Sequence, residues 1–225
     1  MVVRKARKIK DKWKEKKWVS VSAPDSFNNV PLEDIPITDE EKAKGRVIEV
    51  TLFDILKGDP SQYQYKLYFQ IDKVVGEKVT TSFKRYEYAK EYLRSLVRRG
   101  SSKINFVIDA KTKDGYVFRI KVIALSHREL NSSRQHAVRL IARKIIEKSV
   151  PNMTIDEFVQ ASCYNKINSD IMAATKKIIH LRHVGLEKVK LVRSAEAEIT
   201  LLKACLLYTS PSPRDRSLSR MPSSA

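Results

Sequence analysis

Residues 63–75 alternate apolar and polar side chains with a period of two, the pattern of a β-strand with one buried face. The apolar positions are Tyr65, Leu67, Phe69 and Ile71. Gly76 and Glu77 follow as a predicted turn, and residues 79–83 continue as a second strand. The chain must therefore build part of its core on an antiparallel sheet.

The remaining segments follow in an order that indicates the fold class. Strands are predicted from residue 45 to about residue 52, and at 104–109, 116–125 and 184–192; helices are predicted at 86–99, at 132–149, from 154 onward and at 169–179. Strands, a helix, more strands and then helices are typical of an α+β domain. We expect a curved, mainly antiparallel sheet with helices packed on it.

Two of these helices have clear sequence signals. In residues 86–99 the apolar side chains recur at helical spacing and Gly100 follows as a stop. Thr154 and Glu157 have the spacing of a capping box, which opens a helix.

The charge balance restricts the possible partners. The chain has 225 residues and a net charge of +18, which predicts a polyanionic partner, either nucleic acid or an acidic membrane surface. No apolar run approaches the roughly 18 residues that span a bilayer, so we expect no membrane partner. Two Cys residues do not suggest a disulfide framework and favour a reducing cytosol.

The first 17 residues form a basic arm with nine Lys or Arg residues and two acids. They show no helical apolar face, so we expect the free arm to be disordered. An arm of this kind can follow a phosphate backbone, although a solvated terminus has the same composition. The candidate RNA-binding residues here are Arg4, Lys5, Arg7, Lys8, Lys10, Lys12, Lys16 and Lys17. Residues 20–44, with three Pro residues and several acids, are predicted to be a linker.

A hairpin is predicted between the strands at 104–109 and 116–125. Asp114 and Gly115 supply the positive-φ positions that a tight turn requires. Lys111 and Lys113 fit a phosphate contact and an ordinary exposed turn equally well.

The helix at 132–149 is predicted to have one apolar and one basic face. Ser132 or Ser133 can cap its start, and the helix ends before Pro151. Its buried stripe is predicted at Val138, Ile141, Ala142 and Ile145. The candidate RNA contacts on its basic face are Arg134, Arg139, Arg143 and Lys144; solvation or pairing with acids such as Glu147 is the alternative.

Residues 205–225 resemble a translated sequencing adapter, and a natural Ser/Pro-rich tail is the alternative. We expect three regions: the arm at 1–17, a single α+β domain at 18–204 with an incomplete C-terminus, and a disordered tail at 205–225.

Residues 45–56 read GRVIEVTLFDIL. They resemble the signature of a small-ribosomal-subunit protein family of archaea and eukaryotes, called e-S-one or S-three-A-e, with Ile55 where the pattern more often has Leu. The entry into the domain at Lys17, the segment 111–116 and the basic helix resemble the same family in the same order. The resemblance covers about residues 12–193.

The resemblance implies a non-enzymatic structural protein of the small subunit in the cytoplasmic ribosome. It implies a place on the platform near the mRNA exit channel, with rRNA and neighbouring platform proteins as partners and no homo-oligomer. The Lys-rich composition favours an archaeal source. The alternatives are a free-standing RNA-binding regulator and an RNA-processing enzyme.

The residues themselves offer no catalytic or cofactor motif. A zinc site requires about four ligands, whereas only Cys163, His180 and His183 recur near one another in the chain. The sequence lacks a Gly-rich phosphate loop. Glu49 and Asp54 are interpreted as local partners of Arg46 or of RNA-facing Lys residues rather than as catalytic groups. We therefore expect no metal and no cofactor.

Overall fold

The computed structural model describes residues 13–14 and 16–194. The predicted arm up to Lys12 and the tail at 205–225 lie outside these residues.

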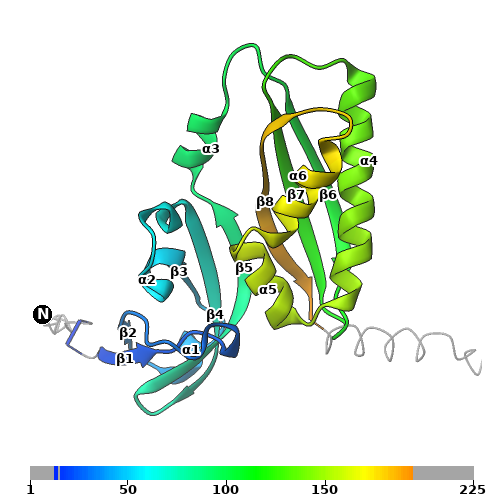
Figure 1. Ribbon diagram of the computed structural model, residues 1–225. Coiled ribbons are helices and arrows are strands. Elements are labelled where there is room, and N and C mark those ends of the chain that lie inside the picture. Colours follow the sequence, from blue (N-terminus) through cyan, green and yellow to red (C-terminus); the bar gives the residue numbers. More distant parts are fainter. Residues whose placement is uncertain (1–12, 15, 195–225) are drawn as a thin grey trace, which may run out of the picture.

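One eight-stranded sheet organises the described chain (Figure 1). Its strands are β1 (Lys17–Val21), β2 (Ile35–Ile37), β3 (Val47–Thr51), β4 (Tyr65–Val75), β5 (Lys78–Tyr88), β6 (Lys103–Lys111), β7 (Val117–Ser126) and β8 (Leu181–Arg193). They are ordered β2-β1-β5-β8-β7-β6, and β4 pairs with both β5 and β3. Among the strands that the structure describes, only the β1–β5 pair is parallel, so the predicted mainly antiparallel sheet is confirmed.

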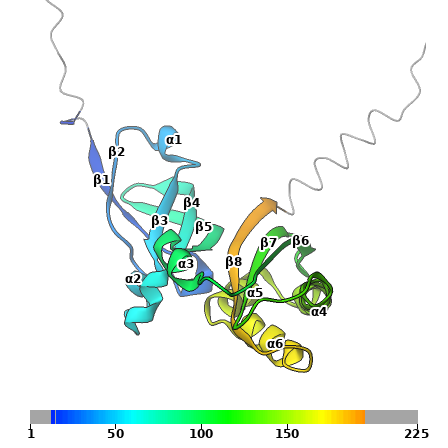
Figure 2. The same cartoon turned by 90° about the horizontal axis from the view of Figure 1, so that it is seen from above.

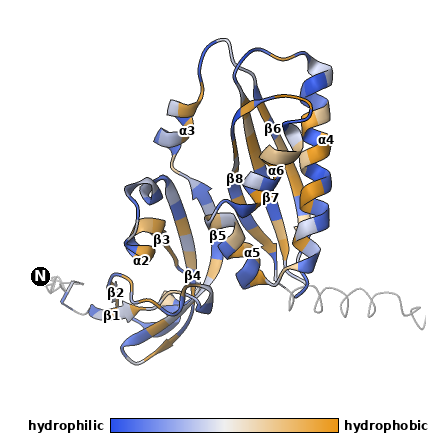
Figure 3. Ribbon diagram, viewed as in Figure 1, coloured by the Kyte–Doolittle hydropathy of each residue, from blue (hydrophilic) through white to orange (hydrophobic). Residues whose placement is uncertain are grey.

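The helices complete the predicted α+β fold. They are α1 (Glu40–Ala43), α2 (Leu52–Leu56), α3 (Lys90–Leu96), α4 (Ser132–Ser149), α5 (Ile155–Cys163) and α6 (Lys166–Thr175). The last three lie on the same side of β6, β7 and β8 (Figures 1 and 2). Apolar residues are concentrated where these strands meet α4 and α6 (Figure 3). The capping box of α5 is present, with Thr154 accepting from the backbone of Glu157.

Strand β5 joins two lobes of the sheet. Along its length it pairs with β4, its first residues also pair with β1, and residues 85–87 pair with β8. The first lobe thus contains β1 to β5 and the second contains β6 to β8 with the three long helices (Figure 1). Tyr86 at the junction is fully buried.

The predicted helix at 86–99 is confirmed only for its middle part. Tyr86 and Tyr88 belong to β5, and the helix is limited to Lys90–Leu96. The rings of both tyrosines pack with Tyr65 of β4. Aromatic residues suit a pleated surface with such cross-strand partners, so tertiary packing overrides the local helical spacing.

The predicted linker at 20–44 is also wrong. It contains the end of β1, all of β2 and α1. Val21, Phe27 and Ile37 are buried, so the segment contributes to the core. Pro36 is tolerated because β2 is an edge strand.

Smaller differences concern element ends. Leu52 begins α2 instead of ending a strand, α6 starts earlier than predicted, and Asn131 rather than a serine stands at the N-cap of α4. The predicted stripe of α4 is confirmed at Val138 and Ala142; Ile146 is a buried position that it missed.

Gly185 of β8 is predicted to be essential to the junction. An added Cβ would lie 2.1 Å from Tyr88 Oη. We expect Gly185→Ala to lower the free energy of unfolding by about 1–3 kcal/mol, because a well-packed site cannot accept the methyl group without displacing the ring. Urea denaturation measures this change.

Gly58→Ala is the matched control. Its Cβ would meet only the Gln62 side chain, at 3.0 Å, and that side chain can move. We expect a change within about 0.5 kcal/mol. Equal stability of both variants would show that Tyr88 does not constrain β8.

Candidate nucleic-acid interface

The segment at 45–56 is a strand-to-helix connection in which acids stabilise the fold. Asp54 accepts a hydrogen bond from the Thr51 backbone N–H at 3.1 Å, and Thr51 Oγ1 accepts from the Asp54 backbone N–H at 3.3 Å, which caps α2. Glu49 pairs with Lys66 at 2.6 Å, and this bond lowers the pKa of Glu49. The acids are therefore local partners as predicted, although these partners do not include Arg46.

The described residues provide no metal cluster of His, Cys, Asp and Glu. Cys163 is buried, and burial raises the pKa of its thiol to about 12. Burial also lowers the pKa of His183. None of the helices in the part of the chain that the structure describes is long and apolar enough to cross a membrane.

The inner end of the predicted arm is the part that the structure describes. Lys16 Nζ lies 3.8 Å from the centroid of the Trp13 ring, a cation–π contact. Lys17 is exposed at the start of β1, and the neighbouring Trp18 is 62% exposed. The six other candidate residues, from Arg4 to Lys12, lie outside the described residues.

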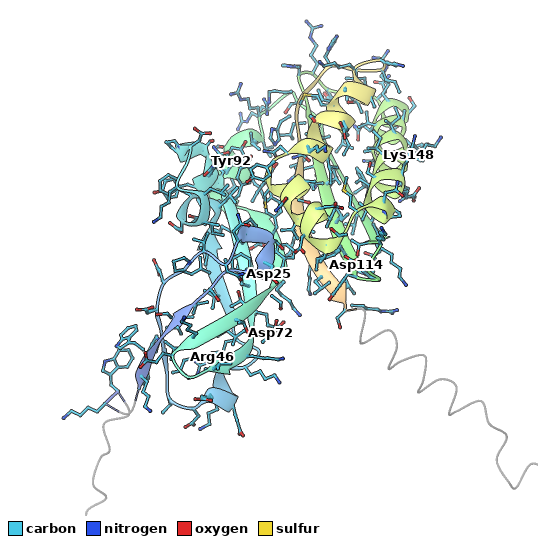
Figure 4. The ribbon with its side chains drawn as sticks, turned by 60° about the horizontal axis from the view of Figure 1, so that its bottom comes forward. Asp25, Arg46, Asp72, Tyr92, Asp114 and Lys148 are labelled. Atoms are coloured by element: carbon cyan, nitrogen blue, oxygen red, sulfur yellow. The ribbon has the colours of Figure 1, made fainter. Side chains whose placement is uncertain are left out.

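The predicted hairpin is confirmed between β6 and β7. Gly115 has φ +85°, as the tight turn requires. Asp114 accepts a hydrogen bond from the backbone N–H of Ile155 at 2.8 Å, so the tip is fastened to the start of α5 (Figure 4). Lys111 and Lys113 are both exposed beside this fixed tip.

The basic residues of α4 do not form one face. Arg134, Arg143 and Lys144 are exposed, whereas Arg139 is half-buried and lies 3.5 Å from Gln135 Oε1. At about 100° per residue, Arg139 and Arg143 lie on one side of the buried stripe, while Arg134 and Lys144 lie toward the other side and the back. Lys148 on the last turn also points to solvent (Figure 4).

A second basic surface lies on the sheet and is absent from the sequence prediction. Cross-strand neighbours share a face, so the register places Arg85, Lys190 and Arg119 in one row and Lys188 and Lys121 in the next. All five are half-buried or exposed. Their signal was present in the sequence as bases at alternate positions of two strands, Arg119 with Lys121 and Lys188 with Lys190.

Acids on this sheet surface hold the bases in place. Arg119 donates two hydrogen bonds to the Asp109 carboxylate, both at 2.8 Å. Lys121 donates a hydrogen bond to Glu187 at 2.6 Å. Glu87 accepts from Tyr68 at 2.8 Å and pairs with Lys188 at 3.1 Å. Burial raises the pKa of Glu87, but the bonds from Tyr68 and Lys188 outweigh it and the net pKa is lowered.

We predict that α4 contributes to RNA binding from both sides. Replacing Arg134, Arg139, Arg143 and Lys144 by Gln removes up to four phosphate contacts, so the salt slope of rRNA binding should fall by up to about 3 to 4. Each double variant, Arg139→Gln with Arg143→Gln and Arg134→Gln with Lys144→Gln, should lower the slope by about 1.4–1.8.

Filter binding at several salt concentrations gives the slopes. Lys42→Gln is the control, because this exposed Lys pairs with Asp39 in the other lobe. An unchanged slope together with an unchanged circular dichroism spectrum would exclude α4 from the interface.

We predict that Glu87→Gln weakens the junction in a pH-dependent way. The lowered pKa means that the carboxylate stabilises the fold above its unfolded-state pKa, about 4.3. The free energy of unfolding of the variant should therefore be about 1–2 kcal/mol lower than that of the unchanged chain near neutral pH. This difference in stability should shrink as the pH falls below about 4.3. Denaturation from pH 7 to pH 3 measures it.

Asp72→Asn is the control, since this exposed carboxylate accepts one bond, from Ser82 at 3.1 Å. A Glu87→Gln effect that is equal at every pH would contradict the assigned role of the charge.

The sequence was compared with known proteins. Residues 4–195 match the Ribosomal S3Ae family. The chain is 47% identical over 184 residues to the small ribosomal subunit protein eS1 of Desulfurococcus amylolyticus, covering 82% of this chain and 86% of that protein.

Two further archaeal relatives carry the same name. The protein of Saccharolobus islandicus (strain L.S.2.15 / Lassen #1) is 43% identical over 188 residues, covering 84% of this chain and 90% of the relative. That of Sulfurisphaera tokodaii is 42% identical over 186 residues, covering 83% and 96%. The chain therefore belongs to the Ribosomal S3Ae family and is a structural protein of the small ribosomal subunit, not an enzyme.

Proposed function

We propose that the protein binds rRNA on the platform of the small subunit, near the mRNA exit channel and the rRNA 3′ end, and so supports translation. The observation that carries the proposal is the family match over residues 4–195. Neighbouring platform proteins are the other partners, and the chain acts without a cofactor and as a single copy.

The proposed mechanism is electrostatic and geometric. Lys and Arg side chains neutralise phosphates and fix the register of the rRNA, while the α+β body acts as a rigid spacer. Shape and assembled context contribute more to specificity than the reading of base edges.

Four surfaces are proposed to contact the rRNA. They are the arm up to Lys17, the hairpin with Lys111 and Lys113, both sides of α4, and the sheet row around Arg119 and Lys190. The hairpin supports this role because Asp114 fixes its tip, so its two Lys residues are presented without a large ordering cost.

The experiment is crosslinking of the chain to rRNA in intact small subunits after a high-salt wash. We expect the chain to stay bound and its crosslinks to map to the 3′-terminal region of the small-subunit rRNA. Crosslinks confined to another region would contradict the platform position, and complete release by the wash would favour a free-standing regulator.

A nuclease assay on the washed chain tests the RNA-processing alternative. We expect no magnesium-dependent cleavage of rRNA fragments. Reproducible cleavage that a single substitution in the chain abolishes would contradict the structural role.

A further inference from the structure

The first lobe is a curved sheet with two edge strands that face each other across a groove. Its strand order is β2-β1-β5-β4-β3, so β2 and β3 are the ends. Among the described residues, β3 forms a ladder only with β4 and β2 only with β1. The outer edge of β3 therefore presents backbone N–H and C=O groups without a strand partner, whereas Pro36 at the centre of β2 has no N–H to donate.

A cavity of about 670 Å³ lies between β3 with the start of α2 and the segment 31–35, which leads into β2. It is lined by Leu32 and Ile35 on the β2 side and by Ile48 and Val50 on the β3 side. These four side chains are half-buried and pack against the lobe's core. The floor of the groove is thus apolar and continuous with the interior, as it would be beneath a missing strand.

The rim of the groove is acidic, in contrast to a chain of net charge +18. Glu33, Asp34 and Asp54 line it together with Glu49, and Lys57 is the one base among its lining residues. Lys66 compensates Glu49. Three carboxylates remain opposed by one amine, so the groove repels RNA and favours a cationic occupant.

We infer that this groove binds an extended, Lys- or Arg-containing segment of a neighbouring small-subunit protein as an added strand on the edge of β3, with β2 across the groove. The inference rests on the proposed function, since that function supplies the neighbouring protein. Backbone hydrogen bonds to the edge of β3 provide affinity, and alternate side chains provide specificity.

The chemistry of the segment follows from the lining. One set of alternate side chains faces Leu32, Ile48 and Val50 and must be apolar, because strand neighbours alternate in direction. The other set faces outward to the carboxylates and must be basic. β3 has five residues, so a segment of about five residues covers its edge.

The probe is a seven-residue capped peptide of alternating Lys and Val, titrated against the full chain. Two matched peptides accompany it: the same sequence N-methylated at alternate residues, and one with Glu in place of Lys. We expect the Lys-Val peptide to bind with chemical-shift changes at residues 32–35 and 47–51. N-methylation should weaken binding more than tenfold, since it removes strand hydrogen bonds without changing charge.

Variants test the rim. Glu33→Lys should weaken the Lys-Val peptide about threefold or more, whereas Glu129→Lys, the same change on an exposed loop of the other lobe, should not. Equal binding of the N-methylated peptide, or no effect of Glu33→Lys, would overturn the added-strand assignment.

Carbodiimide crosslinking of intact subunits identifies the occupant. We expect Glu33 or Asp34 to couple to a Lys of another protein. Coupling to Lys residues of this chain's own arm, or to none, would overturn the assignment. Glu33→Lys should leave the crosslinks between the chain and rRNA unchanged. A wrong assignment of the groove is therefore distinguishable from a wrong assignment of rRNA binding.

Discussion

The pairing of β5 with β8 is the interaction on which the rest of the molecule depends. Residues 85–87 form this strand pairing between the lobes, whereas β1 pairs with the first residues of β5 on the same edge and β4 pairs along the opposite edge. Fully buried Tyr86 fills the junction, and Tyr88 occupies the space that a side chain at Gly185 would take. Close approach of a ring to a backbone requires glycine, so a single residue type in β8 allows two half-sheets to become one.

The elements that were predictable from the sequence are those whose signals come from residues close together in the chain. The alternation at Tyr65 to Ile71, the Asp114–Gly115 turn and the Thr154–Glu157 capping box each depend on residues close in the chain, and each is confirmed. The wrong predictions concern segments whose structure is determined by contacts with residues far away in the sequence. Strand β1 is held by a parallel pairing with β5, and Tyr86 satisfies a helical spacing but finds its ring partners across the sheet. Neither fact is readable from a local window.

The candidate interface divides in the same way. Helix α4 was predicted, with its exposed Arg and Lys residues, because helical periodicity is local. The two pairs of bases on α4 are set apart by helix geometry itself. Arg139 and Arg143 lie on one side of the buried stripe, and Arg134 and Lys144 lie toward the other side and the back. The sheet row of Arg85, Lys190 and Arg119 draws one residue from each of three strands, so only the register brings it together.

Acidic residues explain why a basic chain folds and still presents its bases. Asp54 and Glu157 complete the capping boxes of α2 and α5. Asp114 fastens the hairpin, and Glu87 connects Tyr68 to Lys188. These carboxylates satisfy backbone or neighbouring groups inside the fold, whereas the bases of α4 and the hairpin remain at the surface. Glu33 departs from this division, because it lies beside the apolar groove next to the edge of β3. Basic and acidic side chains thus lie on different surfaces of the molecule. Phosphates are attracted to the basic surfaces and repelled by the acidic groove, so RNA and an added strand would not compete for one site.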